Sequence, residues 1–107
     1  MVSELKSEVE QRITQVVRET VRAEAIYLFG SRSRGDARAD SDFDILVVVA
    51  GQFERGELIR FATLCRQRLA AHDIDADVLV KSNTEVRDYA DKLGSVVYEA
   101  LKSGVAL

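Results

Sequence analysis

The sequence predicts a small α/β domain in which helices pack on a three-stranded mixed sheet. Three observations lead to this fold class. Short, almost entirely apolar runs indicate buried strands. Longer stretches with apolar residues at helical spacing lie between and around them. The chain has 107 residues, 47% of them hydrophobic and 31% charged, which fits one globular domain spanning residues 1–107.

The first half of the chain predicts one helix and two central strands. Residues 3–22 have apolar side chains at i, i+3 and i+4 with charges between them, and Ser3 is a suitable N-cap. Residues 25–29 form a short apolar run that Gly30 ends. Residues 43–50 are apolar and β-branched on both faces, as in a buried strand. We expect a short helix in the polar segment between the two strands.

The second half predicts a helix, a third strand and a final helical segment. Residues 54–71 return to helical spacing, and residues 74–80 alternate as a strand does. Ser82–Glu85 is a capping box that opens the last helix. Gly94 inside this segment costs about 1 kcal/mol relative to alanine, so a division into two helices stays open. Gly104 is a suitable stop signal.

Composition excludes several classes of protein. The net charge of −3 argues against a protein that grips a nucleic-acid backbone, and we expect no direct nucleic-acid binding. No apolar run reaches the roughly 20 residues of a membrane span, and the polar N-terminus does not resemble a signal peptide. We therefore expect a cytoplasmic protein with no membrane partner. The single cysteine, Cys65, falls at a core-facing helical position and is expected to be a small buried side chain.

The most informative segment runs from Gly30-Ser31 to Asp42-Phe43-Asp44. Alternate residues of a strand share a face, so Asp42 and Asp44 are expected to point to the same side. Neighbouring carboxylates are suitable ligands for a hard divalent cation such as Mg²⁺. The Gly-Ser turn offers backbone N–H groups and a hydroxyl to phosphate oxygens. Together these residues predict a site for a metal-bound nucleoside triphosphate.

Two arginines follow this turn directly. Arg32 and Arg34 lie close to the acidic residues along the chain. We expect them to pair with triphosphate oxygens or with nearby carboxylates, and a solvent-exposed role is the alternative for either one. The predicted nucleotide-binding residues are therefore Gly30, Ser31, Arg32 and Arg34.

A third carboxylate is needed if the site holds two metal ions, as phosphoryl-transfer enzymes often do. Asp73, Asp75 and Asp77 share one face of the third predicted strand. Resemblance to the polymerase-β-type nucleotidyltransferase superfamily, which has a lone Asp between apolar residues on this strand, implies Asp77 in Ala76-Asp77-Val78-Leu79 as the preferred candidate, with Asp75 as the fallback. The alternative is an edge strand that shows a solvated polar face. The predicted catalytic and metal-binding residues are Asp42, Asp44 and Asp77.

These motifs resemble the polymerase-β-type nucleotidyltransferase superfamily, in which Gly-Ser is followed by Asp-x-Asp. The similarity covers nearly the whole chain, but only the catalytic core of the larger members, so the chain is similar to the minimal nucleotidyltransferases. The resemblance implies a nucleotidyltransferase-type core with two Mg²⁺ ions and ATP as substrate. It also implies a HEPN-domain toxin as partner in a hetero-oligomer, with AMP transferred to a tyrosine hydroxyl of that toxin.

Two other functions remain open at this point. The chain could be a binding-only antitoxin that neutralises its partner by occlusion, although an inactive copy has no physical reason to keep clustered carboxylates. It could also transfer a nucleotide to a small molecule, although the absence of a second domain and of a basic face argues against small-molecule and RNA acceptors. The sequence leaves the nucleotide, the acceptor and the stoichiometry with a partner undetermined.

Overall fold

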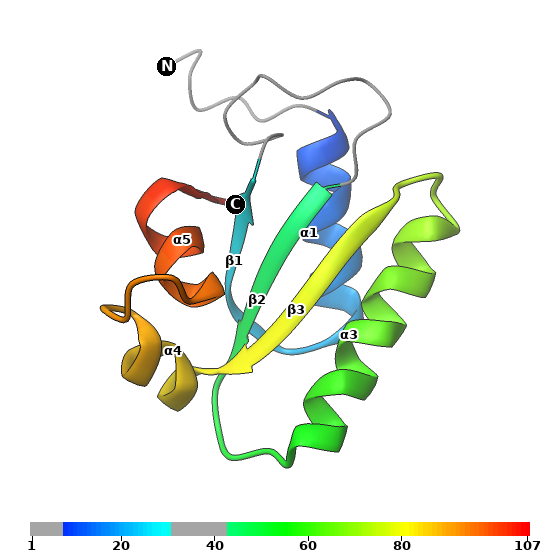
Figure 1. The fold of residues 1–107 in the computed structure, drawn as a ribbon. Coiled ribbons are helices and arrows are strands. Elements are labelled where there is room, and N and C mark those ends of the chain that lie inside the picture. The colour runs from blue at the N-terminus through cyan, green and yellow to red at the C-terminus, as the bar shows by residue number, and fades with distance from the viewer. Residues whose placement is uncertain (1–7, 31–42) are drawn as a thin grey trace.

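The computed structural model describes residues 8–30 and 43–107, and its core is a four-stranded mixed sheet (Figure 1). The strand order is β3-β2-β1-β4. Strand β2 runs parallel to β3 and antiparallel to β1, and β4 is antiparallel to β1. The described elements are, in chain order, α1 (Glu8–Thr20), β1 (Ala23–Phe29), β2 (Phe43–Val49), α3 (Arg55–Ala70), β3 (Ala76–Ser82), α4 (Asn83–Tyr89), α5 (Val96–Ser103) and β4 (Val105–Ala106).

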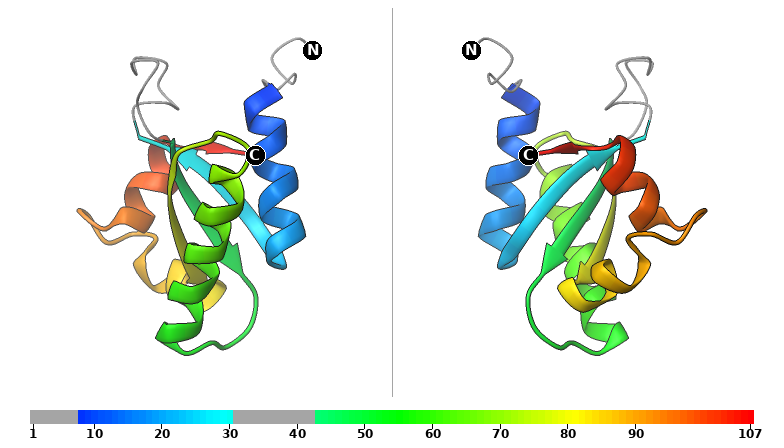
Figure 2. Two further views of the ribbon diagram at one scale, coloured as in Figure 1. Left: turned by 90° about the vertical axis from the view of Figure 1, so that its right-hand side faces the viewer. Right: turned by 90° about the vertical axis from the view of Figure 1, so that its left-hand side faces the viewer.

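Helices cover both faces of the sheet. Helices α1 and α3 lie on one side, while α4 and α5 lie on the other (Figure 2). The larger core lies under α1 and α3, where Ile13, Ile45, Cys65 and Leu69 are completely buried. A smaller cluster lies on the opposite face, around Leu46, Val48 and Ala100. Alternation along β2 divides its side chains between these two cores, which explains why both faces of the strand are apolar.

The predicted fold class is confirmed, but the prediction of three strands is wrong. Val105 and Ala106 add a short strand antiparallel to β1, and the amide of Leu107 donates to the carbonyl of Ile26 at 2.9 Å. A two-residue strand is too short to show alternation in the sequence. Strand β3 begins at Ala76, two residues after the predicted start, and ends at Ser82.

The last helical segment consists of two helices, the division that Gly94 had left open. Helix α4 ends at Tyr89 and α5 begins at Val96, with Gly94 at a φ of 86° between them. The predicted capping box is present, because the amide of Glu85 donates to the Ser82 hydroxyl at 3.2 Å. The predicted Ser3 cap and the short helix before β2 fall outside the described residues. None of the described helices is long and apolar enough to cross a membrane.

Candidate active site

The sheet brings two of the predicted carboxylates side by side. Asp44 is the register partner of Asp77 across the parallel pair β2 and β3. On its other side Asp44 is the register partner of Phe29, the last residue of β1. Register partners on adjacent strands present their side chains to the same face of the sheet. The end of β1 and the starts of β2 and β3 therefore meet at one place, with two carboxylates on one face.

Gly30 lies directly against one of these carboxylates. Its φ is 78°, in the left-handed region that favours glycine. A Cβ atom added to Gly30 would overlap Oδ2 of Asp44 and would lie 3.1 Å from Cγ of that residue. The backbone after β1 therefore passes so close to the Asp44 carboxylate that only glycine leaves room for it. The sequence predicted that the Gly-Ser turn offers donor groups to phosphate oxygens, and it did not predict this contact between Gly30 and Asp44.

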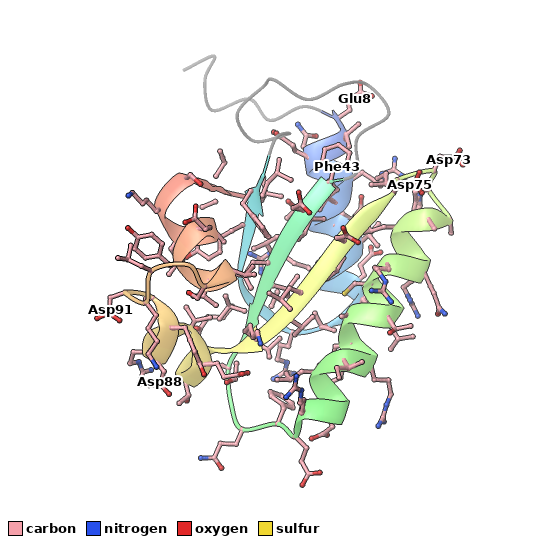
Figure 3. All side chains as sticks on the ribbon, viewed as in Figure 1. Glu8, Phe43, Asp73, Asp75, Asp88 and Asp91 are labelled. Carbon is pink, nitrogen blue, oxygen red and sulfur yellow. The ribbon has the colours of Figure 1, made fainter. Side chains whose placement is uncertain are left out.

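The other two acidic residues before β3 have different positions. Asp73 lies in the turn after α3 with a φ of 61°, and the carbonyl of Asp75 accepts a hydrogen bond from the amide of Phe43 at 3.1 Å. Both precede the first residue of β3. Figure 3 shows Phe43, Asp73 and Asp75 gathered at one end of the sheet, with Asp88 and Asp91 at the far end of the molecule. Within this acidic end, Asp77 rather than Asp75 is in register with Asp44.

The two carboxylates differ in exposure. Asp44 is half-buried, whereas Asp77 is exposed. By strand alternation both project to the face that carries the smaller core, where Phe29 and Leu79 pack around Leu46. The site therefore has an apolar floor under α5 and an open side above Asp77. Such a site can bind an anionic ligand only if a cation or a donor group offsets the carboxylate charge.

The remaining predicted site residues, Ser31, Arg32, Arg34 and Asp42, lie outside the described residues. Among residues 8–30 and 43–107, no group of three or more His, Cys, Asp or Glu side chains forms a metal site. Asp44 and Asp77 nevertheless fit the chemistry of a hard cation, because they offer oxygen ligands on one face of the sheet.

The single cysteine is not part of this site. Cys65 lies on the core-facing side of α3 and is completely buried. Burial raises the pKa of its thiol to about 11, and the nearby Arg68 lowers it only in part. The thiolate is the nucleophilic form of cysteine, so this side chain is unreactive at neutral pH. The prediction of a small buried side chain is confirmed.

Comparisons with known proteins identify the family of the chain. The family model for polymerase beta nucleotidyltransferases matches residues 11–107. The chain is 26% identical to a chain of a toxin–antitoxin complex with AMP-PNP, covering 91% of this chain and 70% of that one with a TM-score of 0.59. It is 27% identical to a chain of a tyrosine-to-alanine mutant of the MntA-HpeT toxin–antitoxin complex, covering 92% and 70% with the same TM-score of 0.59.

A third structure shares the fold. It is a chain of the tri-AMPylated Shewanella oneidensis HEPN toxin in complex with MNT antitoxin, with 23% identity, coverage of 92% and 67%, and a TM-score of 0.53. No curated protein sequence gives a significant match. The family match covers nearly the whole chain, including β1, β2 and β3 with the paired carboxylates. This chain therefore belongs to the polymerase beta nucleotidyltransferase family.

Proposed function

We propose that this chain is an antitoxin that transfers AMP from ATP to a tyrosine hydroxyl of a HEPN-type RNase toxin. The observation that carries the proposal is the in-register pair Asp44 and Asp77 beside the glycine that ends β1. Two aligned carboxylates at an open sheet end suit phosphoryl transfer, in which positioning and charge neutralisation supply most of the catalysis. We treat residues 1–107 as one minimal nucleotidyltransferase domain.

Asp42, Asp44 and Asp77 are the residues we propose to hold two Mg²⁺ ions. Bound Mg²⁺ would neutralise triphosphate charge and favour ionisation of the acceptor hydroxyl. Gly30, Ser31, Arg32 and Arg34 would orient the triphosphate. In the reaction, the tyrosine oxygen bonds to the α-phosphorus, the bond from that phosphorus to the pyrophosphate oxygen breaks, and the hydroxyl proton passes to a carboxylate or to water. ATP and Mg²⁺ are both abundant in the cytoplasm, where we place the protein.

The comparisons support the nucleotide and the partner to different degrees. The AMP-PNP complex supports an adenine nucleotide as substrate and a toxin as partner. The complex with the AMPylated HEPN toxin is the reason for choosing a HEPN toxin as acceptor, but at 23% identity its similarity to this chain shows only a shared fold. The acceptor and a hetero-oligomer with the toxin are therefore the parts of the proposal that most need an experiment.

The test uses the purified chain and a HEPN-type protein, which is sought first in the gene next to that of this chain. The two proteins are incubated with Mg²⁺ and each of the four nucleoside triphosphates, and the intact mass of the toxin is measured. We expect a gain of one or more adenylyl groups with ATP, mapped by fragmentation to tyrosine. A toxin that forms a complex but gains no mass with any nucleotide would overturn the transferase proposal in favour of occlusion.

Variants of acidic residues make this test specific. Asp44→Asn and Asp77→Asn should each reduce transfer by orders of magnitude. Asp88→Asn is the matched control, since Asp88 is an exposed carboxylate at the far end of the molecule (Figure 3). Equal transfer by Asp77→Asn and Asp88→Asn would remove Asp77 from the catalytic set.

A further inference from the structure

A groove of about 800 Å³ follows the outer edge of β3. One wall comes from α3 and the other from α4 and the start of α5. Residues of both faces of β3 line it, Val78 and Val80 on the α3 side and Leu79 and Lys81 on the α4 side. The groove therefore straddles the edge of the sheet rather than lying on one face, which is the shape that an added strand requires.

The backbone at this edge has groups that face into the groove. Strand β3 is the outermost strand of the described sheet. The amide of Phe43 donates a hydrogen bond to the carbonyl of Asp75, so Asp75 and every second residue after it direct their backbone groups toward β2. The N–H and C=O groups of Val78 and Val80, which lie between these residues, therefore point away from β2. These valines are only 7% and 3% exposed, so their outward groups lie at the floor of the groove. A buried backbone group without a partner costs free energy that a docked strand would recover.

Large apolar side chains stand exposed along both walls. Ile59 on α3 is 58% exposed, while Tyr89 of α4 and Val96 of α5 are 43% and 48% exposed. All three line the groove. They would offer contacts to alternate side chains of an extended segment lying between the two walls.

The charge of the groove distinguishes between possible occupants. Its cationic residues are Arg55, Arg66 and Lys81, and its one carboxylate, Glu85, lies 3.7 Å from the Lys81 ammonium. Within the described part of the chain, Arg55 and Arg66 form no ion pair. Two copies joined edge to edge would bring these cationic groups together, which disfavours self-association. An acidic segment would complement them.

We propose that the β3-edge groove docks an extended peptide segment with apolar and acidic side chains, which adds to the sheet as a further strand beside β3. The groove begins at Val78, next to Asp77, so a docked segment leads toward the candidate active site. That this segment belongs to the protein acceptor rests on the proposed function, whereas the docking itself does not.

The probe is a short blocked peptide in which valine and glutamate alternate, carrying a fluorescent label. Its counterpart has lysine in place of glutamate. Fluorescence anisotropy without nucleotide should show at least tenfold tighter binding of the glutamate peptide. The double variant Arg55→Glu/Arg66→Glu should reverse this preference. The control Arg60→Glu/Arg68→Glu makes the same change in net charge at exposed α3 positions that do not line the groove, and it should bind like the wild type.

Hydrogen exchange tests whether the peptide adds as a strand. Binding should slow exchange of the Val78 and Val80 amides, which face the groove. The amide of Leu79 faces β2 and should change little. Peptide binding that leaves the Val78 and Val80 amides unchanged would overturn strand addition. Equal affinity for the two peptides, or concentration-dependent self-association through this edge in sedimentation, would overturn the choice of occupant.

The failure of docking and the failure of the proposed function give different results. Loss of adenylyl transfer in Asp44→Asn with unchanged peptide binding supports both inferences. If the wild-type chain binds the peptide but transfers nothing to the toxin, the proposed function is contradicted and the docking proposal is still supported. No binding of the glutamate peptide by a chain that transfers normally overturns the groove alone.

Discussion

At Gly30, one added methyl group should reduce nucleotide binding by more than its effect on stability explains. An added methyl group would overlap the Asp44 carboxylate and would hold a side chain at a φ of 78°, which costs roughly 1–2 kcal/mol by itself. We expect Gly30→Ala to lose most of its Mg·ATP affinity in calorimetric titration, because Asp44 must move out of line with Asp77.

Gly94 supplies the matched control for this prediction. It also has a positive φ, 86°, but an added Cβ would meet no atom within 4 Å. Gly94→Ala should therefore lose a similar amount of stability in urea unfolding while keeping the nucleotide affinity of the wild type. If both variants bind Mg·ATP equally well, the close packing of Gly30 and Asp44 has no role in the site.

Cys65 makes stability depend on pH in the alkaline range. Burial raises its pKa from 9.0 to about 11. Below about pH 9 the thiol is neutral in the folded and the unfolded chain, so its full contribution to the free energy of unfolding is present. Between about pH 9 and about pH 11 only the unfolded chain releases the thiol proton, so the free energy of unfolding falls as the pH rises. The shift corresponds to about 3 kcal/mol at most.

The measurement is the free energy of unfolding in urea, from about pH 8 to about pH 11, for the wild type and Cys65→Ala. Lysine and tyrosine titrations affect both proteins, so the difference between the two curves isolates the thiol. We expect the wild type to lose stability more steeply than the variant. Parallel curves would contradict the effect of burial on this pKa.

At the scale of elements, the sequence predicted the long elements well and the short or shifted ones poorly. Residues 43–50 were predicted to be a buried strand and match β2 closely, because apolar residues on both faces leave few alternatives. The predicted start of β3 was wrong by two residues. Asp73 and Asp75 alternate with apolar residues as a strand does, yet the chain is still leaving α3 at Asp73, whose φ is 61°.

Strand β4 was missed because contacts made by the backbone, rather than any sequence pattern, hold it in place. The amide of Gly104 donates to the carbonyl of Ala100 at 2.9 Å, and the chain then pairs with β1. An added Cβ at Gly104 would overlap the carbonyl oxygen of Ala100 and would lie 3.0 Å from that of Leu28. Both are backbone atoms, which cannot turn aside as a side chain would.

We therefore expect Gly104→Ala to lower the free energy of unfolding by roughly 1–3 kcal/mol, as overpacking does. Gly56 in α3 is the control, because an added Cβ there would meet nothing within 4 Å. Gly56→Ala should be neutral or stabilising by up to about 1 kcal/mol. Equal stability of the two variants in urea unfolding would contradict the close packing around β4.

At the scale of the whole molecule, the sequence named candidate site residues but did not predict how Asp44 and Asp77 are aligned across the sheet. Alternation alone put Asp73, Asp75 and Asp77 on one face. Only the pairing of β3 with β2, which depends on residues distant in sequence, aligns Asp77 with Asp44. The β3-edge groove was not predicted either, because it arises where α3, α4 and α5 pack around one strand and no local pattern records it.

The alignment of Asp77 with Asp44 predicts different effects of removing the charge of Asp77 and of Asp75. Asp77→Asn should reduce transfer to the toxin by orders of magnitude, with most Mg·ATP affinity kept, as expected for a group that acts mainly in the transition state. Asp75→Asn should reduce transfer far less, since Asp75 precedes β3 and is out of register with Asp44. The opposite ranking in single-turnover assays would make Asp75 the third ligand.

Under the proposed function, the chain would neutralise a toxin in cells either as an enzyme or only as a binding partner. The comparison is growth of cells that express the toxin with the wild type, with Asp44→Ala/Asp77→Ala, or with Arg55→Glu/Arg66→Glu, at matched expression. If transfer neutralises the toxin, the carboxylate variant should fail to rescue growth while still forming a complex with the toxin. If docking at the β3 edge delivers the acceptor, the arginine variant should also fail, but through loss of the complex. Full rescue by the carboxylate variant would instead mean that occlusion is sufficient, and the paired carboxylates would need another explanation.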